Sequence, residues 1–332
     1  MKILLATHQL EKTGGTETFS YAMATSLKRL GYDVEYYCVK RGAVSERIEA
    51  LGIPFMSRKT YDLVILNHKS VAERLCGKGV LIQTCHGVIP EIEQPSRYAD
   101  LWVGVSDEVR SHVESLGFPA VTMWNGVDCE RFKPLNELQD HLTTVLSLCQ
   151  SEQAHAMVQT CCEHLNVAFI RADKAMDDVW SIEKLMNRAD MVVGVGRSLY
   201  DAMACGRTVV SFDVRSYNKQ VSGYGYLSSD NISSAMADNC VNRYASNPLD
   251  VNSLELEMAK YNKEDGTFFR QFALEHLNVD RQVQRYIQLY EQFLSQEREK
   301  PFYQKAKRYL RKKKQQFYVW QKYFFSFGKS RY

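Results

Sequence analysis

The amino-acid sequence predicts an α/β protein made of two doubly wound domains that face each other across a cleft, followed by a basic helical tail. Short apolar strands alternate with helical segments, and this alternation runs twice along the chain. The two series are separated by NGVDCERFKP, residues 125–134, whose Asn-Gly pair and proline are typical of a turn and a linker. A chain of 332 residues is also too long for one typical core.

The first series of elements begins at the amino terminus. Lys2–Thr7 is an apolar strand, and after the loop HQLEKTGG a helix starts near Thr16, with apolar residues at helical spacing until Gly31. Further strands are predicted at residues 34–39, 63–66, 80–84, 101–105 and 120–123. Short apolar strands separated by helices indicate a mostly parallel sheet with helices on both faces.

The second series repeats this pattern. Its strands are predicted at residues 143–149, 167–172, 191–195 and 208–212, with helices at residues 152–164, 179–188 and 198–205. From about Ile232 the chain is mostly helical, and an apolar stripe between Val279 and Leu294 predicts a long helix packed on a domain. We therefore expect a first domain over residues 1–133, a second over 134–283, a closing helix over 284–297 and a basic, aromatic tail over 298–332.

An anion site is predicted in the stretch GVGRSLYDAMACGRTVVSFD. An apolar strand leads into a turn with Gly194 and Gly196, then into a helix opened by Ser198. Turn glycines let the backbone approach a ligand, and the free N–H groups of a helix's first turn favour negative charge. Arg197 would bind a phosphate through two hydrogen bonds, and Asp201 would accept hydrogen bonds from ribose hydroxyls. The alternative is an ordinary strand-turn-helix whose glycines only make the bend.

Composition indicates a cytoplasmic protein. The apolar and charged fractions, 45% and 24%, are those of a soluble globular protein. No segment approaches the ~20 uncharged apolar residues of a membrane span, and the few apolar residues after Met1-Lys2 predict a strand and not a secretory signal. Nine scattered cysteines without zinc-ligand spacing indicate reduced thiols.

Positive charge is concentrated at the carboxyl terminus. Residues 298–332 hold 12 of the 42 lysines and arginines but one of the 39 acids, Glu299. Near one side of a helix fall Phe302, Ala306, Tyr309, Leu310, Phe317, Trp320 and Phe324. Such an amphipathic, basic and aromatic segment is typical of a helix at an anionic membrane surface. The alternatives are a helix packed on the body, an oligomer contact, or nucleic-acid binding, which the acidic body disfavours.

Four short pieces of sequence carry a family resemblance. They are GGTE at residues 14–17, His86-Gly87 after a strand, NGVDCERFKP at the domain junction, and RADMVVGVGRSLYDAMACGRTVV in the second domain. In this order they resemble the retaining nucleotide-sugar glycosyltransferases of the GT-B fold, especially the large family that builds bacterial surface polysaccharides and lipid-linked glycans. The resemblance implies two Rossmann-like domains, with the acceptor on the side of the first and the donor on the side of the second.

The resemblance also implies roles for matching residues. It places Gly14 and Gly15 near the donor phosphates and the acceptor, and His86 near the transferred sugar, although a lone histidine is more often structural. Glu17 matches the motif on the acceptor side, but an acid in a helix's first turn is also simply stabilising. The family has two glutamates separated by seven residues, and the second, which contacts the ribose, corresponds to Asp201.

Two positions depart from the family's pattern. The first glutamate of the pair, which contacts the donor sugar, is Val193 here, and valine cannot form that hydrogen bond. The usual Arg and Lys-Gly of the second domain are replaced by LSLCQSEQAHAM, where His155 is the sole basic residue. Arg197 and Arg171 are therefore the candidates for neutralising the donor phosphates. Either the donor differs, for instance by carrying a single phosphate, or the fold has lost catalysis; the retained glycine loop and Asp201 favour a changed donor.

The predicted reaction moves a sugar from a nucleotide-sugar donor to a glycan or lipid-linked acceptor at the inner face of the membrane, with His86 and Arg197 acting in catalysis. The resemblance implies retention of configuration, with the departing phosphate taking the acceptor's proton. No metal and no other cofactor is implied, because helix N-termini and arginine can neutralise the phosphate and no Asp-x-Asp loop would hold magnesium.

Two rival hypotheses remain open. One is an inactive membrane adaptor that binds a sugar nucleotide or glycan, and the other is a sugar-phosphate or nucleotide-handling enzyme on the same two-domain plan. A dinucleotide oxidoreductase is disfavoured, because the first turn HQLEKTGGTE lacks Gly-x-Gly-x-x-Gly.

Overall fold

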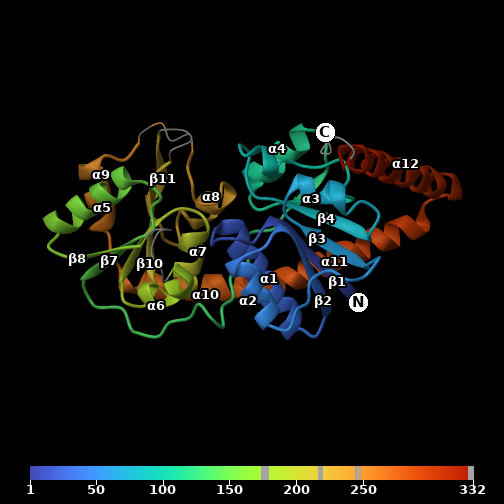
Figure 1. Ribbon diagram of the computed structural model, residues 1–332. Helices are drawn as coiled ribbons and strands as arrows, with labels where there is room; N and C mark the ends of the chain where they lie inside the picture. Colours follow the sequence, from blue (N-terminus) through green and yellow to red (C-terminus); the bar gives the residue numbers. More distant parts are fainter. Residues whose placement is uncertain (173–178, 216–219, 244–245, 247, 328–332) are drawn as a thin grey trace.

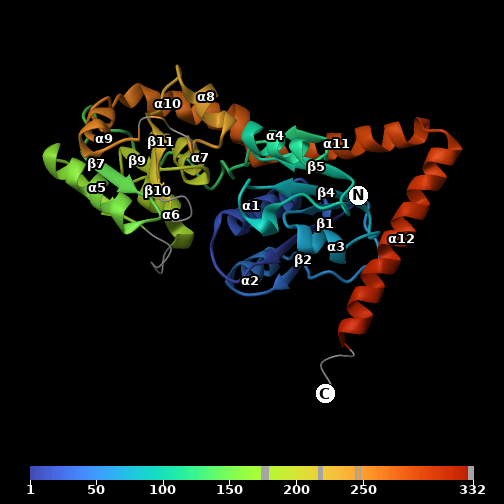
Figure 2. The same cartoon turned by 90° about the horizontal axis from the view of Figure 1, so that it is seen from above.

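The computed structural model describes residues 1–172, 179–215, 220–243, 246 and 248–327 (Figure 1). It contains two mainly parallel sheets with helices on both faces, so the predicted α/β fold class with two Rossmann-like units and a helical tail is confirmed. Figure 2 shows the two units side by side, with the carboxyl-terminal helices running from the second unit back along the first.

The first sheet has the strand order β2-β1-β3-β4-β5-β6, and its described pairs are all parallel. Its strands are β1 (Lys2–Gln9), β2 (Asp33–Lys40), β3 (Leu63–Leu66), β4 (Val80–Cys85), β5 (Leu101–Gly104) and β6 (Ala120–Thr122). Its helices are α1 (Gly15–Arg29), α2 (Ala43–Ala50), α3 (Lys69–Arg74), the 3-10 helix η1 (Glu91–Glu93) and α4 (Asp107–Ser115). Ile3 and Leu4 point into different cores on the two faces, which is why these strands are apolar at every position.

The second sheet has the strand order β11-β10-β9-β7-β8. Its strands are β7 (Thr144–Ser147), β8 (Ala168–Arg171), β9 (Met191–Gly194), β10 (Thr208–Arg215) and β11 (Gln220–Tyr226). Its first helices are α5 (Glu152–His164), η2 (Val179–Ser181), α6 (Ile182–Met186) and α7 (Arg197–Ala204). β11 pairs antiparallel with β10 and is absent from the predicted strands, because Gly223 and Gly225, both at positive φ, interrupt its pattern.

Helices make up most of the described chain after β11, as the sequence predicts. They are α8 (Ile232–Ala237), α9 (Val251–Met258), α10 (Lys263–Phe272), the π-helix η3 (Ala273–Leu277), α11 (Val279–Glu299) and α12 (Phe302–Phe327). The side chain of Asn278 accepts a hydrogen bond of 2.8 Å from the N–H of Asp280 and so caps α11. The long helix therefore begins at Val279, before the expected boundary at residue 284.

α11 completes the core of the first unit. Val279, Val283 and Tyr286 are fully buried in the cluster that also holds Phe19 of α1. The hydroxyl of Tyr286 lies 2.8 Å from the hydroxyl of Thr84 on β4. Val279 and Val283, which were expected to end the second domain, thus pack against the first, because helical periodicity identifies a buried face but not the domain that covers it.

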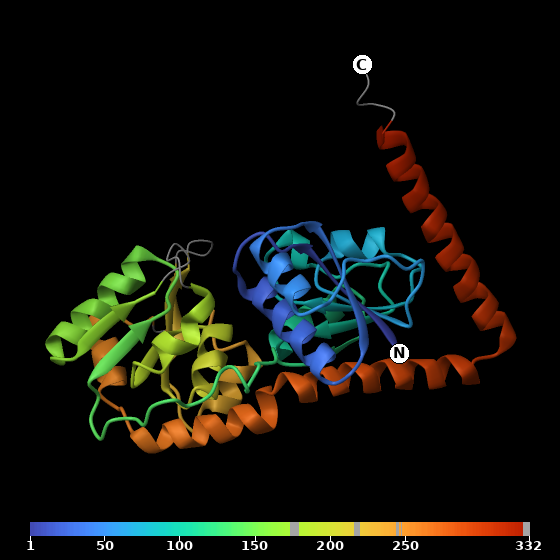
Figure 3. The ribbon, with the colours of Figure 1, turned by 60° about the horizontal axis from the view of Figure 1, so that its bottom comes forward.

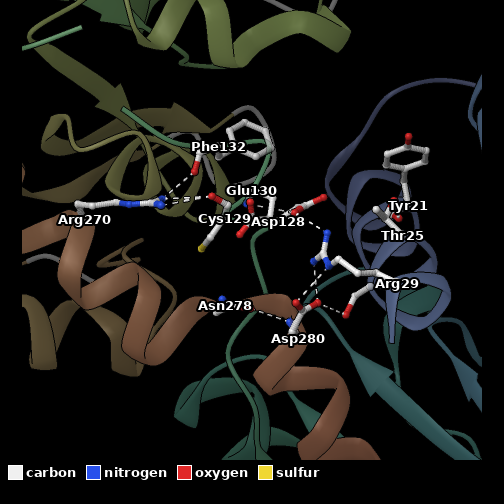
Figure 4. Close-up of polar contacts among 11 residues, drawn as sticks. Tyr21, Thr25, Arg29, Asp128, Cys129, Glu130, Phe132, Arg270, Asn278 and Asp280 are labelled. Atoms are coloured by element: carbon white, nitrogen blue, oxygen red, sulfur yellow. Dashed lines mark hydrogen bonds and ion pairs between the residues drawn. The ribbon is translucent and has the colours of Figure 1, made fainter. Parts of the chain in front are cut away.

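An ion-pair network fixes α11 to α1 and to the linker (Figure 4). The guanidinium of Arg29 on α1 lies 2.6 Å from Asp280 of α11 and 3.3 Å from Asp128 of the linker. From the other side, Arg270 of α10 donates a 2.9 Å hydrogen bond to the carbonyl oxygen of Phe132. Arg29 from the first unit and Arg270 from the second therefore both hold the linker.

α12 docks on the first unit through a polar side. The chain turns sharply between α11 and α12 (Figure 3). The side chains of Arg308 and Lys312 lie 2.8 and 2.9 Å from Asp100, whose side chain is 1% exposed. The helix exposes Phe302, Tyr303, Tyr309, Leu310, Phe317, Tyr318 and Trp320. The side chain of Phe324 and residues 328–332 lie outside the described part of the structure. None of the described helices is both long and apolar enough to cross a membrane.

Candidate functional site

A pocket of about 640 Å³ opens between the two units, at the carboxyl ends of strands from both sheets. The first unit and the linker line it with residues 13–16, Thr18, His86, Glu93 and Asn125. The second unit lines it with residues 148–150, 152, 155, 171–172, 182, 186, 195–198, 201 and 239. Eight of the ten predicted site residues therefore meet here: Gly14, Gly15, His86, Arg171, Gly196, Arg197, Ser198 and Asp201. Ligands of doubly wound sheets bind at this edge.

The turn between β9 and α7 forms the wall of the pocket on the second unit. Gly196 has φ of +62°, a conformation that glycine adopts without strain, and a Cβ atom there would lie 3.0 Å from Asn239. α7 begins at the next residue, so the N–H groups of its first turn lie beside the pocket. The predicted backbone geometry of an anion site is thus present.

Arg197 is oriented by the linker. Its Nη1 donates a hydrogen bond of 3.0 Å to the carbonyl oxygen of Gly126, and its Nη2 lies 3.6 Å from a carboxylate oxygen of Asp201. The side chain is 11% exposed, yet its Nε has no hydrogen-bond partner among the described residues. One edge of the guanidinium is therefore held in place while the Nε donor remains available to a ligand.

Asp201 shares this buried environment, since its side chain is also 11% exposed. Burial raises the pKa of Asp201, and the opposing positive charges of Arg197 and Arg131 lower it. Its Oδ1 has no hydrogen-bond partner in the described chain. The carboxylate is thus placed to accept a hydrogen bond, as a ribose hydroxyl would supply.

Two further residues of the pocket carry buried acceptors that the described structure leaves without a partner. They are Oδ1 of Asn125, on the linker, and Oδ1 of Asn239, beside Gly196. An unpaired buried polar atom costs roughly 1–3 kcal/mol, so such atoms cluster where a ligand completes their hydrogen bonds. Asn239 is a single asparagine in a loop, so no signal in the sequence marks it. Asn125 opens the segment NGVDCERFKP, which the sequence marks as a linker and as part of the resemblance, but not as a binding site.

Gly194 and Glu17 do not line the pocket. A Cβ atom at Gly194 would lie 2.8 Å from the Ser198 hydroxyl oxygen, so this glycine makes room beneath the turn. Glu17 is 5% exposed, and a Cβ atom at Gly14 would overlap its carboxylate. Direct contact of Gly194 and Glu17 with a ligand in this pocket is therefore not supported, and Gly14 brings the backbone close to the buried carboxylate.

His86 is a neutral imidazole with a defined tautomer. Its Nε2 lies 3.2 Å from Oδ1 of Asn67. The amide nitrogen of Asn67 in turn donates a hydrogen bond of 2.9 Å to the hydroxyl oxygen of Ser20. Since Oδ1 can only accept, Nε2 carries the proton and Nδ1 is an acceptor. Burial, together with His68 and Arg197, lowers the pKa of His86 to about 3. His86 is thus suited to accept a hydrogen bond from a hydroxyl and not to act as a cation.

Glu93 lies in the pocket and was not singled out from the sequence. It ends η1, in the loop that follows His86, and nothing in that loop's sequence marks a site. Burial, with a contribution from the negative charge of Glu17, raises the pKa of Glu93 to about 7. The first unit therefore presents a carboxyl group that holds a proton close to neutral pH.

Replacing Glu93 by glutamine should change the pH dependence of stability. Because the folded pKa of about 7 exceeds the ordinary value of 4.5, the folded wild type keeps a proton that the unfolded chain releases between these values. The wild type should therefore lose stability relative to Glu93→Gln as the pH rises from 4.5 to about 7, with no further change above. Thermal melts of both proteins measure this, and a difference independent of pH would contradict the raised pKa.

Arg171 lies at the pocket with a carboxylate partner. Its Nη1 donates a 2.8 Å hydrogen bond to Glu152, whose side chain is 81% exposed. This pairing offsets part of the positive charge of Arg171, which leaves Arg197 better placed for a phosphate. Among the described residues, no group of three or more His, Cys, Asp or Glu side chains could hold a metal ion.

Val193 is fully buried in the core between the second sheet and its helices. Its side chain does not line the pocket. Val193 is therefore an ordinary core residue, although it corresponds to the sugar-binding glutamate of the family that the sequence resembles.

Comparisons with known proteins bear on the fold. No protein-family model matches the chain, and no curated protein matches its sequence. The solved structure of Anabaena HepE with UDP and glucose matches with a TM-score of 0.61 at 14% identity, over 88% of this chain and 100% of HepE. An alpha-glucosyltransferase solved with UDP and a 13-mer DNA matches with a TM-score of 0.54 at 12% identity, over 88% of this chain and 99% of that enzyme. AviGT4, a glycosyltransferase involved in avilamycin A biosynthesis, matches with a TM-score of 0.54 at 12% sequence identity. The match covers 89% of this chain and 98% of AviGT4. This chain accordingly has the GT-B fold.

Proposed function

We propose that this protein is a glycosyltransferase that takes a sugar from a nucleotide-sugar donor. The observation that carries the proposal is the oriented guanidinium of Arg197 beside the first turn of α7, in a pocket between two Rossmann-like units. Two structures with a similar fold contain UDP, which supports a uridine nucleotide as the first donor class to test. The sequence resemblance supports a glycan or a lipid-linked molecule as the acceptor, in the synthesis of bacterial surface polysaccharide.

The reaction needs stabilisation of the leaving phosphate. As the anomeric C–O bond breaks, negative charge grows on the phosphate oxygens, and donors fixed in advance lower the barrier. Arg197 and the first-turn N–H groups of α7, that of Ser198 among them, fill this role from the second unit, whereas the hydroxyl of Ser198 donates to the carbonyl oxygen of Val195. Asp201 and Asn239 accept hydrogen bonds from the nucleotide, and closure of the two units excludes water.

The acceptor approaches from the first unit. Nδ1 of His86 accepts a hydrogen bond from a sugar hydroxyl, and the Gly14-Gly15 backbone borders the same space. Glu93 binds a hydroxyl of the acceptor, since a carboxyl that titrates close to neutral pH both donates and accepts hydrogen bonds. For a retaining transferase, the hydroxyl attacks the face that the phosphate leaves, and the phosphate takes the proton.

A screen for the donor tests this function. Nucleotide sugars and nucleoside diphosphates are compared by thermal shift, and each stabilising compound is then assayed for hydrolysis and transfer. We expect a nucleotide sugar and its nucleoside diphosphate to stabilise the protein, because ligands that bind only the folded state raise its stability. Failure of every compound to stabilise the protein at saturating concentration would overturn the proposal.

Membrane attachment through residues 298–332 forms the second part of the proposal. The exposed face of α12 carries Tyr309, Phe317 and Trp320, interleaved with Lys307 and other exposed basic residues. Aromatic side chains at the level of the headgroups and basic residues near an anionic surface both favour binding. This location, at the inner face of the membrane, would bring the pocket to a lipid-linked acceptor.

Sedimentation with vesicles tests the attachment. The full chain and a chain that ends at Glu297 are mixed with vesicles of phosphatidylcholine, alone or with an equal amount of phosphatidylglycerol. The full chain should sediment with the anionic vesicles and the shortened chain should stay in the supernatant. Equal binding of two folded proteins would discard the membrane role of the tail.

An inactive adaptor of the same fold is the alternative function. Its supporting observations are the buried Val193 and the pairing of Arg171 with Glu152. Binding of a nucleotide sugar without hydrolysis or transfer, even with an extracted lipid acceptor, would favour the adaptor.

A further inference from the structure

A second pocket lies away from the interdomain site, where α11 ends and α12 begins. It has a volume of about 470 Å³, and the loop between α3 and β4 closes it through Gly77 and Gly79. Gly77 has φ of +84°, and a Cβ atom there would overlap the side-chain nitrogen of Gln316 on α12. The loop and α12 therefore approach each other closely beside this pocket.

The inner wall of the pocket is part of an ion-pair network of three cations and two carboxylates. Arg308 lies 2.8 Å from Asp100 and 2.9 Å from Glu297, and Lys312 lies 2.9 Å from Asp100. Lys300 also pairs with Glu297. These contacts fix α12 against the first unit, and they leave the carboxylates neutralised by cations.

The mouth of the pocket adds positive charge. Arg298 and Lys305 line it, and both residues are exposed. The Nζ atom of Lys305 donates a hydrogen bond of 2.9 Å to the carbonyl oxygen of Arg298, and this bond holds the two residues together. Within the described residues, neither side chain forms an ion pair with a carboxylate. Two neighbouring cations of this kind are suited to a phosphate.

Apolar surface continues from this charged mouth. Leu294 and Tyr309 line the pocket, and Tyr309 is 61% exposed. Phe302 and Leu310, close to it on α12, are 86% and 65% exposed. A phosphate held at the mouth would thus have uncovered aromatic and aliphatic side chains beside it, as a phosphate attached to an acyl chain requires.

We propose that this pocket binds the headgroup of an anionic phospholipid, with the phosphate between Arg298 and Lys305 and the acyl chains along Tyr309 and the exposed face of α12. This proposal rests on the proposed membrane attachment. It adds one defined contact with a lipid to the general attraction between basic residues and an anionic membrane. The charge of the mouth and its continuity with the exposed apolar residues favour a lipid over a free anion.

Two charge-matched double variants of the full chain test the site. Arg298→Gln/Lys305→Gln removes the two cations at the mouth. Lys307→Gln/Lys314→Gln removes two exposed cations of α12 that do not line the pocket. Affinity is measured by sedimentation with vesicles of phosphatidylcholine and phosphatidylglycerol in equal amounts. A defined site predicts that the first pair loses at least tenfold more affinity than the second, whereas diffuse attraction weakens both equally.

A soluble lipid tests the pocket without a membrane. Short-chain phosphatidylglycerol, below its micelle concentration, should raise the melting temperature of the wild type and of Lys307→Gln/Lys314→Gln but not of Arg298→Gln/Lys305→Gln. Equal stabilisation of all three proteins would overturn the site, and an equal effect of inorganic phosphate would overturn the commitment to a lipid. Melting temperatures without lipid verify that each variant is folded.

The outcomes separate this site from the membrane role itself. Equal loss of vesicle binding by both double variants overturns the headgroup site while membrane attachment stands. Failure of the wild type to bind any vesicle overturns membrane attachment, and the soluble-lipid measurement then decides the pocket by itself.

Discussion

Replacing Arg197 by alanine should lower the turnover of the donor at least tenfold while the protein stays folded. The variant removes the guanidinium that faces the pocket, and loss of one fixed donor to a developing oxyanion costs roughly 100-fold or more in rate in well-studied sites. The first-turn N–H groups of α7 remain, so residual activity is expected. Arg197→Lys keeps the charge but loses the planar fork and should lie between the wild type and Arg197→Ala.

Arg188→Ala is the control for this experiment, because Arg188 is exposed and lies outside the interdomain pocket. Turnover is measured with the donor that the screen identifies, and circular dichroism verifies folding. Burial raises the pKa of Asp201, so its carboxyl can take up a proton when Arg197 is removed, which limits the loss of stability. If Arg197→Ala turned over the donor at the wild-type rate, Arg197 would have no part in the reaction.

Replacing Tyr286 by alanine should strongly destabilise the protein. The side chain is fully buried in the core of the first unit, and truncating a buried aromatic residue costs about 3–5 kcal/mol. The hydroxyl of Thr84 would also lose the partner that lies 2.8 Å away. Equilibrium unfolding in urea measures the difference in the free energy of unfolding.

Two controls make this measurement specific. Tyr286→Phe removes only the hydroxyl and should cost about 1 kcal/mol. Tyr303→Ala deletes the same side chain at a site on α12 that is 67% exposed, and should change the free energy of unfolding by about 0.5 kcal/mol or less. A loss at Tyr286 no larger than the loss at Tyr303 would contradict the assignment of α11 to the core of the first unit.

Elements whose signal is local were predictable from the sequence. Runs such as Leu63–Leu66 have apolar residues at every position because both faces of the strand are covered. The turn at Gly196 and Arg197 was likewise visible, because glycine, the cation and the start of a helix are neighbours in the chain. β11 was not visible, since its glycines at positive φ resemble turn residues.

The remaining features depend on contacts between distant parts of the chain. Helical spacing showed that α11 buries one face, but only the fold shows that Tyr286 packs in the first unit. Glu93 occurs in a loop without a motif, and Asn125 opens a segment that the sequence marks as a linker and not as a site. The pocket joins them because the loop after β4 and the start of the linker lie at the same cleft. Gly194 and Glu17 matched the family's motifs, yet local packing places them beneath the surface of the site.

The proposed chemistry depends on the turn at Arg197 holding the phosphates of the donor. A crystal structure of the protein with a bound nucleoside diphosphate would show where those phosphates lie. We expect phosphate oxygens within hydrogen-bond distance of Nε of Arg197 and of the first-turn N–H groups of α7. A diphosphate bound elsewhere, with the interdomain pocket unoccupied, would contradict this role of the turn.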